Sequence, residues 1–174
     1  MSKEFVFLFP ITPYLKIETK QVVHIPDFKQ KYQEIFNECI DVRYRQKRFN
    51  INFVLNKGQS VSTMIVNRPN DKTIVMYPKN NWASAITGFD KNTVLRIAGF
   101  HLFDCVDKLA ETAYKSGIKN TKVDEDLTEF FAHRVIEPDF DVSKTPNIDR
   151  SLFTSEFFQM YKIARQNKPW LNQK

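Results

Sequence analysis

The apolar run Phe5-Val6-Phe7-Leu8-Phe9 restricts the fold more than any other part of this 174-residue chain. A strand built from it has no polar face, which is typical of a strand that is buried on both sides. Pro10 and Pro13 follow and end the strand, because proline cannot donate a hydrogen bond to a sheet. We therefore predict a central strand over residues 4–9.

The composition is that of a folded globular protein, with 42% hydrophobic and 26% charged residues. Sixteen phenylalanines but only four glycines exclude a glycine-rich phosphate-binding loop. Cys39 and Cys105 have no CxxC spacing, and both fall in apolar helical patterns, so we predict two buried thiols and neither a disulfide framework nor a zinc site. Without a signal peptide or a membrane-length apolar stretch, we expect a cytoplasmic protein that does not contact membranes.

Alternating apolar residues and turn-forming segments predict five strands. Their connections after residue 48 are short and rich in Asn, Asp, Gly and Pro, which favours antiparallel pairing. The predicted strands span 4–9, 14–25, 48–55, 60–67 and 72–78.

Helical spacing predicts one helix between the second and third strands and three more after the last strand. The expected fold is therefore α+β, with helices packed on one face of a mostly antiparallel sheet. We expect a single domain over 1–174, with a basic β-meander portion at 42–80 and a helical C-terminal half at 90–168. The helices are expected from Phe28 (N-cap Asp27) to Val42, from Asp90 or Asn92 to Ser116 with a left-handed Gly117 after it, over 125–135 and over 151–166.

The net charge of +6 is distributed unevenly. Residues 1–80 carry all of it, whereas 81–174 are neutral overall. The segment 124–141 has a local net charge of −6. Its acidic residues fit the first turn of a helix, but they also fit a segment that faces the basic portion, within one chain or across a dimer.

The densest positive charge lies in the stretch from Arg43 to Arg48, with four cations in six residues. Cations neutralise phosphates while aromatic planes stack on bases, so the stretch suits a nucleic-acid backbone. The alternative is a solvated connection in which Phe49, Ile51 and Phe53 point into the core. The candidate nucleic-acid-binding residues are Arg43, Tyr44, Arg45, Lys47, Arg48, Lys57, Arg68, Lys72 and Lys79.

The leading hypothesis is thus a small non-enzymatic protein that binds nucleic acid largely independently of sequence. The alternative is an interaction or regulatory module that presents the basic face to an acidic protein, or that self-associates into a homo-oligomer. Trp82 and Trp170 are candidate partner-binding residues, although Trp170 also fits a tail that folds back and buries it. We assign no catalytic residue, metal ligand or cofactor.

A third hypothesis comes from Glu18-Thr19-Lys20, which resembles the Glu-x-Lys half-motif of restriction-endonuclease-type nucleases. That resemblance implies a carboxylate that holds Mg²⁺ and a lysine that helps activate water. Cross-strand charges on an exposed strand face are the structural alternative. His101 falls in the apolar stripe of the 90–116 helix, so we predict a buried histidine.

Overall fold

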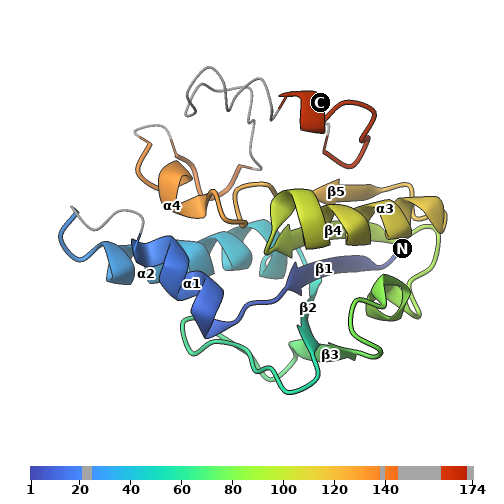
Figure 1. Cartoon of the computed structure of the whole chain (residues 1–174), viewed down its shortest axis with the longest axis horizontal. Helices are drawn as coiled ribbons and strands as arrows, with labels where there is room; N and C mark the ends of the chain where they lie inside the picture. The colour runs from blue at the N-terminus through green and yellow to red at the C-terminus, as the bar shows by residue number, and fades with distance from the viewer. Residues whose placement is uncertain (21–24, 138–139, 145–161, 172–174) are drawn as a thin grey trace.

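The computed structural model describes residues 1–20, 25–137, 140–144 and 162–171, and its centre is a five-stranded sheet (Figure 1). All of the strand pairings are parallel, so the predicted antiparallel sheet is wrong. The strand order is β3-β2-β1-β4-β5. The strands are β1 (Lys3–Leu8), β2 (Asn50–Asn56), β3 (Lys72–Met76), β4 (Val94–Gly99) and β5 (Thr121–Val123).

The central position predicted for the first apolar run is confirmed. β1 pairs with β2 on one side and with β4 on the other. Phe5 and Phe7 pack into a core cluster with α2, whereas Val6 and Leu8 pack into a second cluster with α3. Successive side chains thus point to opposite faces of the sheet, and each face is buried.

Helices cover both faces, so the prediction of helices on one face is also wrong. In Figure 1 α3 lies in front of the sheet and α2 behind it. The helical elements are α1 (Thr12–Lys20), α2 (Phe28–Ile40), the π-helical η1 (Asp41–Arg45), the 3₁₀ turn η2 (Trp82–Ile86), the π-helical η3 (Leu102–Val106), α3 (Asp107–Lys115) and α4 (Phe131–Arg134).

The loop between β2 and β3 explains why the pairing is parallel. The predicted strand at 60–67 is absent, and these residues instead form turns that pack on the sheet. Asn37 of α2 holds this loop, because its side-chain amide donates to the Met64 carbonyl (2.8 Å) and accepts from the Val66 N–H (2.7 Å). Residues 57–71 are therefore a crossover that returns the chain to the starting edge of the sheet.

α1 replaces the first part of the strand predicted over 14–25, of which residues 21–24 lie outside the described part of the chain. Leu15 and Glu18 are the buried residues of α1. They lie three positions apart, which is a helical spacing. The alternation of Leu15 and Ile17 with Lys16 and Glu18 is therefore misleading, because Ile17 is exposed.

β4 replaces the first part of the helix predicted from Asp90 or Asn92 to Ser116. Apart from Arg96, its residues are apolar on both faces, and helical structure begins only at Leu102. Gly99 ends the strand with φ of +117°, and a Cβ atom there would lie 2.1 Å from the Leu8 carbonyl oxygen. Glycine is therefore required for β4 to approach β1. The left-handed Gly117 is confirmed, with φ of +98°.

The remaining helix predictions have mixed outcomes. The helix from Phe28 is confirmed and continues into η1, but Asp27 has φ of 56° and its side chain makes no capping hydrogen bond. The helix predicted over 125–135 is reduced to α4. Most of the helix predicted over 151–166 lies outside the described residues.

Candidate functional site

The strand order defines where a ligand is expected. The chain builds β1, β2 and β3 toward one side of the sheet and then crosses to the other side of β1 to form β4. In open parallel sheets with helices on both faces, ligands bind outside the carboxyl ends of the strands at such a switch point. In this protein that point lies beyond Leu8 of β1 and Gly99 of β4. We call it the carboxyl-edge site.

The backbone at the carboxyl-edge site is unusual. Phe9 follows β1 with φ of 53°, a left-handed conformation that is rare for an aromatic residue and costs free energy. Phe100 donates its N–H to the Leu8 carbonyl (3.2 Å), and the peptide bond between Phe100 and His101 is cis. The His101 ring then lies 5.0 Å from the ring of Tyr14 on α1. His101 is exposed, so its predicted burial is wrong.

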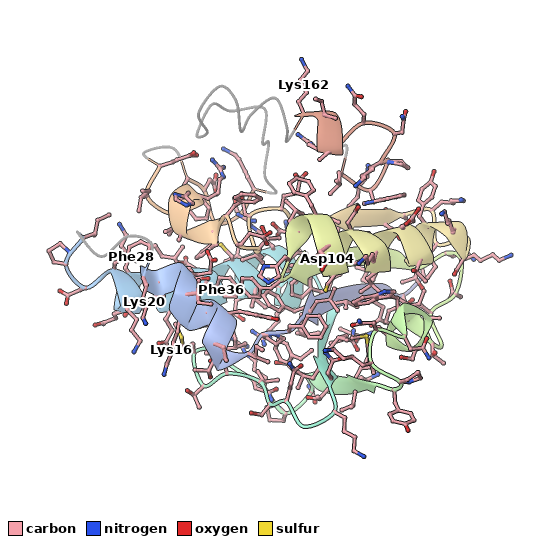
Figure 2. The ribbon with its side chains drawn as sticks, in the orientation of Figure 1. Lys16, Lys20, Phe28, Phe36, Asp104 and Lys162 are labelled. Carbon is pink, nitrogen blue, oxygen red and sulfur yellow. The ribbon has the colours of Figure 1, made fainter. Side chains whose placement is uncertain are left out.

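Cys105 brings a nucleophilic group to this edge. It belongs to η3, which continues into α3, and its side chain is half-buried. The Sγ atom donates to the Asp104 carboxylate at 3.6 Å, and Lys108 donates to the other Asp104 oxygen at 2.5 Å. Asp104 is labelled in Figure 2, beside the first turns of this helical run. A thiol, a carboxylate and an ammonium group therefore form one chain of contacts.

Their pKa shifts follow from these contacts. The hydrogen bond from Lys108 lowers the pKa of Asp104 and keeps this carboxyl group ionised at pH 7. Burial raises the pKa of the Cys105 thiol, and the Asp104 carboxylate raises it further, while a backbone hydrogen bond from His101 lowers it. Cys105 is thus a neutral thiol at pH 7 that contacts a proton acceptor.

Glu129 anchors the start of the same helical run. Its carboxylate accepts the Leu102 N–H at 3.0 and 2.9 Å, satisfying a donor at the helix start that has no partner within the helix. Burial raises the pKa of Glu129. The segment after β5 therefore fixes the orientation of the segment that carries Cys105.

Cys105 was not predicted to be a functional residue. In the sequence the thiol falls in the apolar stripe of one long predicted helix, whereas in the structure it is partly exposed. The available signal was the order of a buried strand, Gly99, two further residues and then a helix, which is typical of a strand-to-helix turn at a ligand site. Cys39 is buried as predicted, and burial raises its pKa to about 12.

Arg43 and Tyr44 belong to the core rather than to the predicted nucleic-acid surface. The Arg43 side chain is 0% exposed, and its guanidinium pairs with Asp124 (3.0 Å) and Asp126 (3.1 Å). Burial alone would lower the pKa of Arg43, but Asp124 raises it above its ordinary value. Tyr44 stacks on Phe5, with ring centroids 3.9 Å apart, and donates to Asp124 at 2.5 Å.

The acidic segment therefore does face the basic portion within one chain, through Arg43. Asp124, Glu125 and Asp126 are all buried, so the first-turn interpretation of these residues is wrong. Asp126 also accepts from Arg134 at 2.8 Å. Burial raises the pKa of Asp126, and the nearby Asp124 carboxylate adds to this rise.

Arg45 and Arg68 are held by carboxylates near the surface. The Arg45 guanidinium contacts Asp41 at 2.7 Å and Asp71 at 2.5 Å, and it also donates to the Val66 carbonyl at 2.8 Å. Arg68 contacts the other Asp41 oxygen at 2.5 Å, while half of its side chain remains exposed. The network fixes both guanidinium groups between η1 and the loop that precedes β3.

A groove of about 450 Å³ lies beside this network. Asn50 begins β2 and Asp71 directly precedes β3, so the groove lies at the amino ends of these strands, opposite the carboxyl-edge site. We call it the amino-edge groove. It is lined by Arg45, Arg48, Phe49, Asn50, Ile51, Arg68, Pro69, Asn70 and Asp71.

The four predicted lysines are all exposed but do not form one surface with these arginines. Lys47 and Lys72 lie toward the amino ends of β2 and β3, whereas Lys57 and Lys79 follow the carboxyl ends of the same strands. The structure thus brings together Arg45, Arg48 and Arg68 but separates them from part of the predicted set. Ile51 and Phe53 are buried, as the structural alternative requires.

Neither tryptophan is fully exposed. Trp170 is buried, and its Nε1 donates to Asp107 of α3 at 2.7 Å, so the tail folds back. The Trp170 carbonyl also accepts the Val123 N–H at 2.9 Å. Trp82 begins η2 and is half-buried. The burial of Trp170 favours a structural role over partner binding.

The Glu-x-Lys strand motif is not present in the structure. Glu18 and Lys20 lie on α1 rather than on a strand, with Glu18 buried and Lys20 exposed (Figure 2). Residues two apart on a helix point about 200° away from each other, so the pair does not converge. His24 lies outside the described residues, and His133 is exposed. Within the described ranges, His, Cys, Asp and Glu form no group of three or more suited to a metal ion.

Comparison with known proteins gives no relative, since neither a family model, nor a curated protein, nor a solved structure matches the chain. In the part of the chain that the structure describes, no helix has the length and apolar character needed to cross a membrane.

Proposed function

We propose that this protein is a thiol-dependent enzyme that acts on a small carbonyl compound at the carboxyl-edge site. The observation that carries the proposal is the position of Cys105, a partly exposed thiol that contacts an ionised carboxylate at the switch point between β1 and β4. A nucleophile within hydrogen-bond reach of a base is the basic requirement of covalent catalysis. The strained Phe9 backbone at the same edge supports this location.

The proposed roles follow from the contacts. Asp104 accepts the Cys105 proton as the sulfur attacks the carbonyl carbon, and Lys108 keeps Asp104 ionised and oriented. The helical run from Leu102 to Lys115 starts here, and the positive end of its dipole stabilises negative charge on the sulfur or on the substrate oxygen. The raised pKa of Cys105 requires this proton transfer, because the resting thiol is neutral.

Acylation by p-nitrophenyl acetate tests the proposal. We expect a rapid release of about one p-nitrophenolate per protein, with the acetyl group found on Cys105 by peptide mass spectrometry. Cys39 serves as an internal control, because it is buried and its pKa is raised further. Cys105→Ala abolishes the rapid release.

Two results would overturn the proposal. One is acetylation of neither thiol, and the other is a release that persists unchanged in Cys105→Ala. Asp104→Asn separates catalysis from simple thiol exposure, because it leaves Cys105 accessible but removes its proton acceptor. Acylation by Asp104→Asn at pH 7 is therefore expected to slow by about 100-fold.

A further inference from the structure

The amino-edge groove combines positive charge with a half-buried aromatic ring. Arg48 is exposed, and the described residues provide no ion pair for its guanidinium. Arg45 and Arg68 share the carboxylates of Asp41 and Asp71, so the three arginines leave a net positive charge. An anionic group is therefore attracted to the groove, and Arg48 is the side chain free to bind it.

Phe49 supplies the aromatic component. It is half-buried, with the Tyr44 ring packed edge-on at 5.4 Å and the Lys3 ammonium 5.7 Å from its ring centroid. Asn50 and Asn70 line the same groove and offer amide donors and acceptors. An aromatic face with amides around it suits a nucleobase, which stacks on the ring and forms hydrogen bonds through its edge.

From this arrangement we propose that the amino-edge groove binds one nucleotide unit of single-stranded nucleic acid. Arg48 and Arg68 contact the phosphate, and Phe49 stacks on the base. The volume of about 450 Å³ matches a small-molecule pocket rather than a duplex groove. Bases in a duplex are stacked on one another, so none of them reaches Phe49 without unpairing.

This site is independent of the proposed thiol chemistry. It lies at the amino ends of β2 and β3, whereas Cys105 follows the carboxyl end of β4. Cys105→Ala therefore leaves nucleic-acid binding unchanged. Arg43, the most buried cation of the sequence-predicted set, plays no part in the contact.

Fluorescence anisotropy with a labelled oligothymidylate across a salt series tests the proposal. The matched variants are Arg48→Gln and Lys79→Gln, which remove the same charge from exposed positions near opposite ends of the strands. We expect Arg48→Gln to weaken binding by about tenfold and to make the slope of log K against log salt shallower by about one, while Lys79→Gln has little effect. Phe49→Leu, which keeps most of the apolar volume, weakens binding by about fivefold through lost stacking.

Each of the following results would count against the proposal. A duplex of equal length that binds at least as tightly as the single strand excludes base stacking on Phe49. A free mononucleotide that matches the oligonucleotide in affinity identifies a nucleotide, rather than a nucleic acid, as the ligand. Equal effects of Arg48→Gln and Lys79→Gln on binding would show that the protein attracts nucleic acid through diffuse charge and not through the groove. An absence of binding at about 50 mM salt would exclude nucleic acid as the ligand and favour an acidic protein partner.

Discussion

Replacing Arg43 with alanine tests how much its buried ion pairs with Asp124 and Asp126 contribute to the stability of the fold. The Arg43 guanidinium is the only side-chain partner that Asp124 and Asp126 share among the described residues. It also donates from Nε to the Val142 carbonyl at 2.7 Å. The substitution therefore leaves two buried carboxylates close together without the cation between them.

The magnitude follows from what remains after the substitution. Asp124 keeps the hydrogen bond from Tyr44, and Asp126 keeps the contact with Arg134. Breaking a buried ion pair by removing one partner costs about 3–5 kcal/mol. Single-domain proteins have total stabilities of about 5–15 kcal/mol, so the variant loses a large fraction of its free energy of unfolding.

Urea unfolding followed by circular dichroism measures the effect. With a slope of about 2 kcal/mol per molar urea, a loss of about 4 kcal/mol lowers the midpoint by about 2 M. Arg48→Ala is the matched control, because this exposed arginine has no ion pair within the described residues, and its loss is expected to cost less than about 0.5 kcal/mol. A urea midpoint for Arg43→Ala within about 0.3 M of the wild type would refute the inference that the Asp124 and Asp126 carboxylates depend on Arg43 for their burial.

Two other features give predictions of the same kind. Gly99→Ala is expected to prevent stable folding, because a Cβ atom would lie 2.1 Å from a backbone oxygen of β1. Gly88→Ala is the control, since a Cβ atom there meets no atom within 4 Å and only the positive φ is unfavourable. Expression level and thermal unfolding compare the two variants, and equal stabilities would contradict the close approach of β4 to β1. Iodoacetamide at pH 8 is expected to modify Cys105 and spare Cys39, as measured by peptide mass spectrometry. Modification of Cys39 as fast as that of Cys105 would contradict the difference in burial between the two thiols.

The parts of the fold that were predicted correctly are those with a local signal. The apolar run at Phe5 and the helical spacing after Phe28 each identify an element without reference to the rest of the chain. The direction of strand pairing has no such signal. It depends on whether residues 57–71 form a hairpin or a crossover, and that is decided by contacts with Asn37 on a different helix.

In the candidate sites, too, only the features with a local sequence signal could be predicted. Arg45 and Arg48 lie three residues apart in the sequence, so their shared groove was partly predictable, although Arg68 joins them only through the loop before β3. The burial of Arg43 was not predictable, because its partner Asp124 lies 81 residues later in the chain. Cys105 was missed because β4 and the helix after it form one continuous apolar pattern in the sequence.

The parallel register of β1 has a consequence for how the chain folds during synthesis. Phe7 pairs with Phe53 on one side and with Ala98 on the other, so both partner strands are made long after β1 itself. Until then α2 can cover only one face of the run, where Phe36 contacts Phe7 with ring centroids 5.6 Å apart. Sheets assembled from such distant segments form slowly and leave apolar surface open to aggregation. Translation rate and chaperone supply are therefore expected to govern the yield of folded protein.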